Sequence, residues 1–292
     1  MTGTLVIGSR FCGPPDSGNG GYVCGLIADY LDGPAEVTLR KPPPLETALN
    51  LERDGHGSVR VRDGQTLIAE AISSPKGPAL QLPDPVSVQQ ARSAGARSHL
   101  RVHPGLHPFP TCFVCGPDRR PGDGLRILVG PVAGRKLSAD LWYPAAELST
   151  ANGYVRTEFM WAALDCAGGV GAIGDAVKGG APFLLGRLSA RQIGEVKAGE
   201  PHVVIGWRLA AQGRKIVAGS ALFAASGQPV AVTQRSSARY RHWPFRCCSS
   251  PLTGTRLPLS GRVRWWRPRS RSRPRAGEHR WPRSARGSAH RP

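Results

Sequence analysis

The feature that most constrains the fold of this 292-residue chain is a unit that occurs twice. Each copy contains a helix pattern that is apolar around most of its surface, at residues 21–31 and 154–177, followed by four short runs with β patterning. A helix without a polar face must be covered on all sides, and a strongly curved antiparallel sheet can cover it. The sequence therefore predicts an α+β protein in which two such sheets pair edge to edge.

Composition divides the chain into four segments. The two copies of the unit occupy residues 1–74 and 111–234, and residues 75–110 between them have the Pro, Ser and Gly content of a linker. Residues 235–292 contain 16 Arg, no Lys and one Glu, so they carry +15 of the formal net charge of +19. The first 234 residues carry only +4, which is ordinary for a soluble domain.

The basic tail at 235–292 lacks helix or strand periodicity, and its Arg, Ser and Pro content predicts disorder. Three interpretations stay open. The absence of Lys favours a shifted reading frame of a GC-rich gene; the others are a solvated tail without a partner and an Arg/Trp arm that binds nucleic acid. Nucleic-acid binding rests on this tail alone and is not expected of the rest.

The cysteine pattern and the N-terminus bear on location. Seven cysteines at irregular spacing do not suggest the disulfide framework of a secreted protein. No basic region followed by an apolar run opens the chain, so no signal peptide is expected. The longest apolar stretch, 159–174, contains Asp165 and is too short for a membrane span. We therefore expect a protein of the reducing cytoplasm, without a membrane partner.

Cys112 and Cys115 form a Cys-x-x-Cys pair in a turn-rich segment. His103 and His107 precede it, and these four side chains are a conceivable tetrahedral zinc set. The spacer from His107 to Cys112 is shorter than in zinc fingers, and prolines stiffen both His positions, so a structural turn with small buried cysteines is favoured. Zinc and a redox pair remain alternatives, and the overall prediction is no cofactor and no metal.

Two motifs resemble those of a known family. CFVCGPDRRPGDGLRI at 112–127 is similar to the Cys-Phe-x-Cys-Gly and Gly-Leu that open hot-dog thioesterases of the phenylacetate-pathway type. FMWAALDCAGG at 159–169 is similar to their central helix. Over roughly residues 10 to 234 the chain resembles a tandem, or double, hot-dog protein of the acyl-CoA thioesterase superfamily. The resemblance implies an acyl-CoA substrate and no cofactor.

The resemblance also implies site residues. In such relatives the thioester carbonyl lies at the backbone amides of a His-Gly-Gly helix start, where the helix dipole stabilises the oxyanion. A carboxylate nine residues after that His position, on the facing helix, serves as base or nucleophile. Here Asn19, Gly20 and Gly21 open the first helix, with Asn in the His position, and Ala28 occupies its acid position.

In the second half Asp165 occupies the acid position, but residues 156–158 read Arg-Thr-Glu in place of His-Gly-Gly. The resemblance thus implies one composite catalytic site per chain, formed by Asn19, Gly20 and Gly21 of the first half and Asp165 of the second. The reciprocal pair, Ala28 with residues 156–158, would be inactive.

Simpler interpretations stand beside this one. Asp165 lies two helical turns after Glu158, so both acids could belong to a polar helix face. The Gly-Asn-Gly-Gly stretch could be a turn with an N-cap Asn. Asp29 adjoins Ala28, and a shift of one residue would restore an acid to the first half.

Three functional classes follow from the residues and the resemblance. The first is an acyl-CoA thioesterase that uses Asp165. The second is a non-catalytic acyl or acyl-CoA binding protein, favoured if Asp165 is buried against its neighbours. The third is a hot-dog hydratase for enoyl-CoA, but neither His56 nor His202 has the sequence context of its Asp–His pair. An exposed sheet edge would favour a homodimer.

Overall fold

The computed structural model of the protein describes residues 2–173 and 182–239. Among them, the sheet strands in chain order are β1 (Thr2–Val6), β2 (Ala35–Leu39), β3 (Ala48–Arg53), β4 (Ser58–Asp63), β5 (Thr66–Ser73), β6 (Gly130–Pro131), β7 (Ser138–Trp142), β8 (Phe183–Gln192), β9 (His202–Gln212), β10 (Lys215–Ala224) and β11 (Pro229–Arg239). The α-helices are α1 (Gly20–Ala28), α2 (Val88–Ala96), α3 (His99–Val102) and α4 (Thr157–Ile173). None of these helices is long and apolar enough to cross a membrane.

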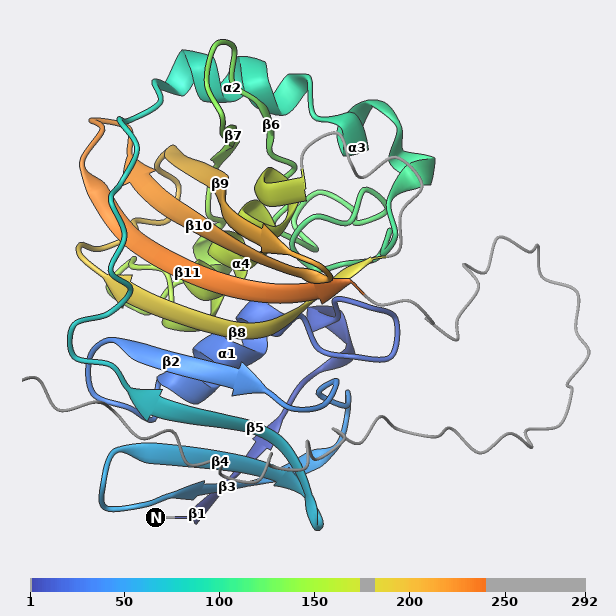
Figure 1. Cartoon of the computed structure of the whole chain (residues 1–292), viewed down its shortest axis with the longest axis vertical. Helices are drawn as coiled ribbons and strands as arrows, with labels where there is room; N and C mark the ends of the chain where they lie inside the picture. Colours follow the sequence, from blue (N-terminus) through green and yellow to red (C-terminus); the bar gives the residue numbers. More distant parts are fainter. Residues whose placement is uncertain (1, 174–181, 240–292) are drawn as a thin grey trace, which may run out of the picture. The chain divides into compact units, whose positions relative to one another are not determined.

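All strands belong to one antiparallel sheet, in the order β1-β3-β4-β5-β2-β8-β11-β10-β9-β7-β6 (Figure 1). The first five come from the first half of the chain and the other six from the second. The halves join where β2 pairs with β8, with Val37 opposite Leu188. The predicted edge-to-edge pairing of two sheets is therefore confirmed.

The first half has the predicted order of one strand, one helix and four strands. Asn19 begins α1 by accepting a hydrogen bond from the amide of Tyr22, and Gly33, with a φ of 77°, turns the chain toward β2. Buried and exposed residues alternate along β3 and β4, so one face of these strands belongs to the hydrophobic core that also includes residues of α1. The predicted hairpin between the third and fourth β runs is the pair β4–β5.

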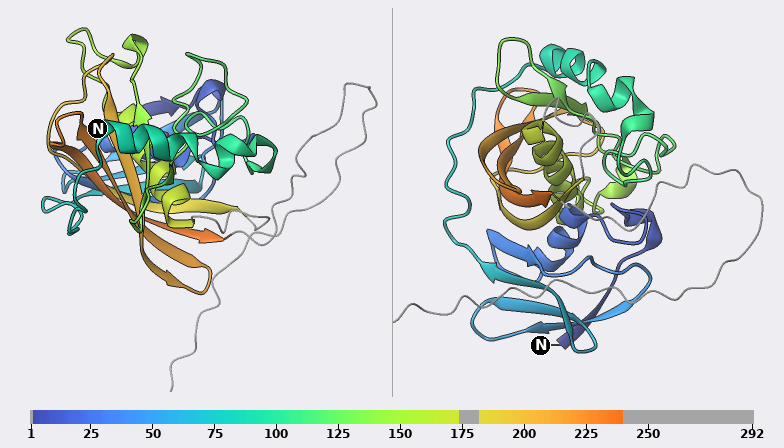
Figure 2. Two further views of the ribbon diagram at one scale, coloured as in Figure 1. Left: turned by 90° about the horizontal axis from the view of Figure 1, so that it is seen from above. Right: turned by 45° about the vertical axis from the view of Figure 1, so that its right-hand side comes forward.

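The second half wraps its sheet around α4. Twelve of the 17 residues of α4 are buried, so this helix has too little polar surface to lie on the outside of the protein. The helix contacts β9, β10 and β11, and the sheet curves around it in the right-hand view of Figure 2. The expectation of an apolar helix inside a curved sheet is confirmed for this half.

The strand expected at residues 125–130 is largely wrong, because only Gly130 belongs to a strand. The amides of Leu125 and Ile127 instead donate to the carbonyls of Phe113 and Val114 in the Cys112–Cys115 turn. Arg126 between them has a φ of 55°, which an extended strand does not allow. The apolar residues of the segment are still buried, but against the turn and not in a sheet.

The segment interpreted as a linker, residues 75–110, contains α2. Ser87 and Gln90 form a capping box at its start. Its buried face consists of the small residues Ala91, Ala94 and Gly95, which lie against β7 and its neighbours. Because this face is small and the rest is polar, α2 has little of the hydrophobic pattern that identifies a helix in a sequence.

The predicted start of the disordered tail at residue 235 is wrong by five residues. β11 continues to Arg239, and its last residues pair with β8 and β10. Residues 240–292, with the remainder of the predicted tail, lie outside the described residues.

Candidate active site

The four predicted site residues come together where the start of α1 meets the middle of α4. The backbone amide of Gly21 donates to Asp165 Oδ2 at 2.9 Å. Gly20 lies beside the same oxygen, since a Cβ built on it would be 3.4 Å from Asp165 Oδ2. Asn19 is the N-cap of α1 and is 2 % exposed. Two segments 144 residues apart in sequence thus form one cluster.

Glycine at the start of α1 has a packing role as well. A Cβ on Gly21 would lie 2.4 Å from Asp165 Cβ and 2.7 Å from the carbonyl oxygen of Trp161, and one on Gly25 would lie 2.4 Å from Glu158 Cα. These two glycines, one turn apart, let α1 and α4 approach more closely than any side chain allows. Close approach of the two helices brings the Gly21 amide within reach of Asp165.

Arg235 is the site residue that the sequence analysis missed. Its Nη1 lies 2.9 Å from Asp165 Oδ1 and donates to the Asp165 carbonyl at 2.5 Å, and its side chain is 5 % exposed. Gly169 makes room for it, because a Cβ there would be 2.2 Å from Nη1. Arg235 lies on β11, in a polar stretch that resembled the start of the tail. The signal that could have placed it is alternation, since Thr233, Arg235 and Ser237 are all buried.

The surroundings of Asp165 oppose its charge. Burial raises the pKa of its carboxyl group, and the positive charge of Arg235 and the hydrogen bond from Gly21 only partly counteract this effect. Asp165 is 4 % exposed. Its Oδ1 receives no well-aligned hydrogen bond and Arg235 Nε has no partner among the described residues, so the ion pair is incompletely satisfied.

The opposite end of the helix pair has different chemistry. Gly25 of α1 packs on Glu158 of α4 there, and Glu158 forms an ion pair with Arg156 at 3.2 Å. Ala28, in the acid position of the first half, is buried, whereas Asp29 is the exposed C-cap of α1. A one-residue shift would therefore not place an acid inside the first half.

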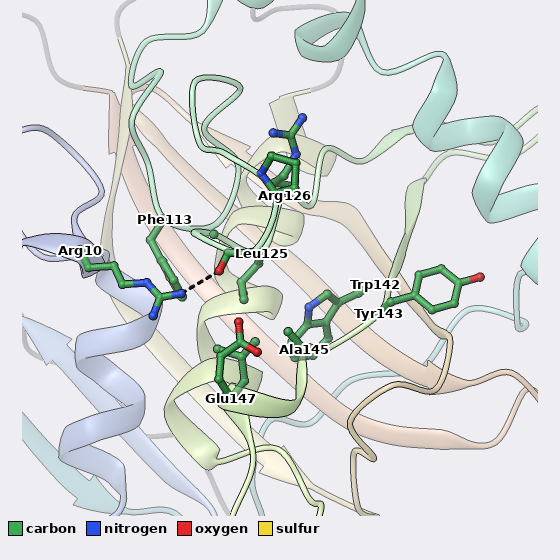
Figure 3. A pocket seen from close by; sticks show the side chains of 12 residues that line it. Arg10, Phe113, Leu125, Arg126, Trp142, Tyr143, Ala145 and Glu147 are labelled. Carbon is green, nitrogen blue, oxygen red and sulfur yellow. Dashed lines mark hydrogen bonds between the residues drawn. The ribbon is translucent and has the colours of Figure 1, made fainter.

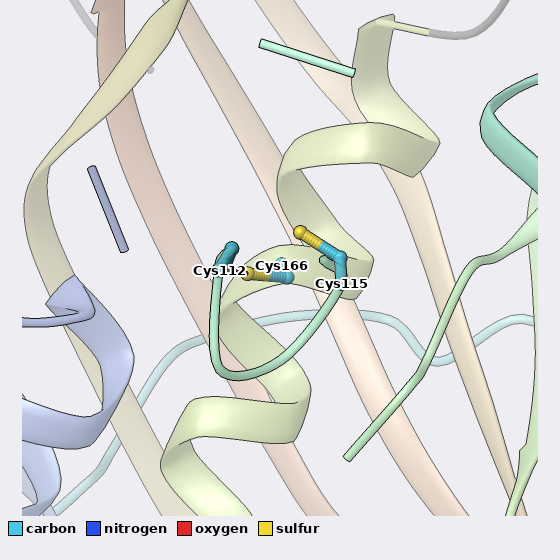
Figure 4. A group of neighbouring side chains, drawn as sticks. All are labelled: Cys112, Cys115 and Cys166. Carbon is cyan, nitrogen blue, oxygen red and sulfur yellow. Dashed lines mark hydrogen bonds between the residues drawn. The ribbon is translucent and has the colours of Figure 1, made fainter. Parts of the chain in front are cut away.

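Three cysteines adjoin the start of α1. The sulfur atoms of Cys112, Cys115 and Cys166 all lie within 4.8 Å of one another, in a group that does not include His103 or His107 (Figure 4). Cys112 and Cys115 are buried, as the sequence predicted for the turn. Cys115 and Cys166 donate hydrogen bonds to Cys112, and these bonds hold the pKa of Cys112 well below its usual range. The pKa of each donor thiol is raised, because its proton is held in the bond to Cys112.

A cavity of about 240 Å³ opens beside the Cys112–Cys115 turn (Figure 3). Apolar side chains line it, including Phe113, Leu125 and Trp142, and the guanidinium groups of Arg10 and Arg126 lie among its polar lining. The ring of Phe113 also packs edge-on against Tyr22 of α1, with centroids 6.1 Å apart. Phe113 thus belongs both to the cavity wall and to the packing around the start of α1.

Comparison with known proteins is informative only at the level of structure. No protein-family model and no curated protein matches the sequence. The tesB protein of Mycobacterium avium subsp. paratuberculosis has a similar structure, with a TM-score of 0.51 and 13 % identity over 82 % of this chain and 93 % of that one. The structure of an acyl-CoA thioesterase II from Mycobacterium marinum gives a TM-score of 0.50 and 12 % identity, over 82 % of this chain and 93 % of that one.

A conserved protein of unknown function with a hot-dog fold, from Alicyclobacillus acidocaldarius, gives a TM-score of 0.50 and 10 % identity, over 83 % of this chain and 93 % of that one. At such identities the likeness concerns the fold and not the activity. The chain has the double hot-dog fold of thioesterase-like proteins.

Proposed function

We propose that the protein hydrolyses acyl-CoA thioesters at a single composite site, formed by the start of α1 and by Asp165 of α4. The observation that carries the proposal is the 2.9 Å contact between the Gly21 amide and Asp165 Oδ2. It brings a helix N-terminal donor and a carboxylate from different halves of the chain within bonding distance. A thioester carbonyl needs such a donor, and an attacking water needs such a base.

In the proposed reaction, the carbonyl oxygen of the thioester replaces Asp165 Oδ2 as the acceptor of the hydrogen bond from the Gly21 amide. The released carboxylate removes a proton from water, and the resulting hydroxide attacks the carbonyl carbon. The amides of Gly20 and Gly21, together with the α1 dipole, stabilise the negative oxygen of the tetrahedral intermediate. Collapse of the intermediate breaks the carbon–sulfur bond, and the departing thiolate takes the proton that Asp165 removed from water, which restores the carboxylate.

Two features support this role. Burial raises the pKa of Asp165, and a carboxylate with a raised pKa is a stronger base toward water. The cavity beside Phe113 combines apolar walls with Arg10 and Arg126, a combination suited to a ligand that joins an acyl chain to phosphates.

The test is thiol release from short, medium, long and aromatic acyl-CoAs by the full-length protein and by Asp165→Asn. We expect turnover with at least one of them, and a loss of at least about a hundredfold in the variant. Asp140→Asn is the matched control, because it neutralises another buried aspartate of the second half, which pairs with Arg101. An equal loss in both variants would contradict a catalytic role for Asp165.

A second candidate function is non-catalytic binding of acyl-CoA on the same fold. The burial of Asp165, at 4 % exposure and paired with Arg235, is the specific observation that favours it. Isothermal titration with a thioether analogue of acyl-CoA separates the two candidates. Binding of the analogue by a folded protein that releases no thiol from any acyl-CoA would replace the hydrolase proposal with this one.

A further inference from the structure

The three-cysteine group beside the site has the dimensions of a metal centre. A zinc ion bound by thiolates at about 2.3 Å in tetrahedral geometry holds the sulfur atoms about 3.8 Å apart. Cys112 Sγ and Cys166 Sγ are 4.0 Å apart, and all three sulfurs lie within 4.8 Å of one another. Small side-chain adjustments would therefore bring all three sulfurs to bonding distance of one ion. A disulfide, at about 2.0 Å, would need a much larger displacement.

The sulfurs also have the outer contacts typical of metal ligands. Asn19 Nδ2 lies 3.6 Å from both Cys112 Sγ and Cys166 Sγ, so its amide donates toward two of the three sulfurs. The Asn19 side chain is fixed in this orientation, because its Oδ1 accepts from the Tyr22 amide at 3.0 Å. Donors that face sulfur favour the negatively charged thiolate, which is the form that binds metals.

The chain positions of the three cysteines favour a structural centre. Cys112 and Cys115 are on a turn without regular secondary structure, and Cys166 is on α4, 54 residues beyond Cys112. An ion bound to all three would attach the turn, and with it the cavity wall at Phe113, to the central helix. Three thiolates are soft ligands of the kind that select zinc over magnesium or calcium.

We propose that Cys112, Cys115 and Cys166 bind one zinc ion as thiolates, with a solvent molecule in the fourth position. Binding displaces three thiol protons, and no oxidant or reductant takes part. The proposal is independent of the proposed hydrolase activity, since it concerns the anchoring of the turn and none of its ligands is assigned to the reaction. It differs from the set considered in the sequence, because Cys166 takes the place of the two histidines.

The experiment uses the full-length protein with Cys247→Ser and Cys248→Ser, which removes the two thiols outside the described residues. The reduced, metal-free protein is titrated with Zn²⁺ and, separately, with Co²⁺. We expect one equivalent of zinc to remain after gel filtration, and Co²⁺ to give the visible absorption bands of a tetrahedral thiolate complex. These readouts need no substitution at the site and are therefore independent of whether variants fold.

Serine substitutions then locate the ion. Cys112→Ser, Cys115→Ser and Cys166→Ser should each weaken zinc binding at least about a hundredfold. Cys24→Ser is the matched control, a buried cysteine of α1 outside the group, and should bind zinc as before. Circular dichroism verifies that each variant is folded.

Three results would overturn the proposal. They are a full-length protein that retains no zinc, a Co²⁺ spectrum without thiolate charge transfer, and zinc binding that persists in the three serine variants. A disulfide between any two of the three cysteines in freshly purified protein would instead identify a redox pair.

Discussion

Two buried aspartates of the second half, Asp140 and Asp165, each pair with an arginine, and the two carboxylates are satisfied very differently. Asp140 accepts from the amides of Leu128 and Leu141, at 2.8 and 2.9 Å, and from Arg101 Nη2 at 2.8 Å. Both of its oxygens are therefore bonded. The Arg101 side chain is 38 % exposed, so water solvates the rest of its guanidinium group.

Asp165 and Arg235 have fewer partners and almost no solvent. Their side chains are 6 % and 5 % exposed, and the Gly21 amide is the one well-aligned donor to the carboxylate among the described residues. A buried pair that leaves bonding capacity unused costs free energy, and such groups are often retained for function. The comparison indicates that Asp140 joins two segments of the fold, whereas Asp165 has capacity left for a substrate or a water.

The largest expected effect is that of truncating the chain before Arg235, which removes the partner of Asp165 and leaves the Asp140–Arg101 pair in place. A chain that ends at Gln234 lacks the last five residues of β11, of which Arg235 is the first, whereas one that ends at Arg239 keeps all five. We expect the shorter chain to be unfolded or aggregated, because it leaves Asp165 unpaired and parts of β8 and β10 uncovered. Circular dichroism and size-exclusion chromatography measure this. Two equally folded chains would contradict a structural role for the Asp165–Arg235 pair.

The next largest effect is the loss of stability when the arginine of each pair, Arg235 or Arg101, is replaced by alanine. Arg235→Ala should lower the free energy of unfolding by roughly 3–5 kcal/mol, because it leaves a buried carboxylate without its counter-charge. Arg101→Ala should cost less, since Asp140 keeps two backbone hydrogen bonds and Arg101 is partly solvated. Urea denaturation of both variants gives the difference. Equal losses would mean that burial of the arginine does not determine its contribution.

The glycines that face the two aspartates allow a finer comparison. A Cβ on Gly21 would be 2.4 Å from Asp165 Cβ, and one on Gly95 would be 1.9 Å from Asp140 Oδ1. Each Gly→Ala change should destabilise the protein by about 1–3 kcal/mol, and only Gly21→Ala should also reduce thiol release. Gly3→Ala is the control, because no atom lies within 4 Å of its built Cβ. Thiol release that falls equally in Gly95→Ala would show a general loss of structure.

The smallest effect is in the pH dependence of stability. Burial raises the pKa of both Asp140 and Asp165 above the ordinary value of 3.8, so the folded state holds these protons more tightly than the unfolded state. Each carboxyl's contribution to stability is therefore present at low pH and is lost as the pH rises through its raised pKa. The difference between the unfolding free energy of the wild type and that of each Asp→Asn variant should decrease as the pH rises above 3.8. An increase for either residue would reverse the assigned direction of its pKa shift.

Much of the fold could be predicted from the sequence because its signals are local. The apolar surface of the two helices and the alternation along β3 and β4 predicted the wrapped helices and the order of strands. That the helix start at Asn19, Gly20 and Gly21 faces Asp165 was predicted from a resemblance, and in the structure Gly20 and Gly21 lie against this aspartate. Their role in catalysis stays a prediction.

The features that the sequence concealed depend on distant or polar residues. Arg235 is 70 residues from Asp165 and follows Thr and Gln, so the inward face of β11 has no hydrophobic pattern there. Cys166 joins the Cys112–Cys115 turn across 54 residues, whereas the nearby histidines form no part of the group. A local sequence pattern depends only on residues that are near one another in the chain. A buried ion pair or a group of thiols forms between distant residues that the folded sheet brings together, so no local pattern predicts it.

The pairing of β2 with β8 has a consequence for how such a site can change. In a symmetric dimer every substitution occurs in both subunits, so a helix has to supply the amide donors of one site and the carboxylate of another. Here the two helices belong to one chain and are encoded separately, while the covalent connection keeps each beside its partner at any protein concentration. One helix can therefore lose its acid and the other its glycines without loss of the remaining site, and each is free to specialise.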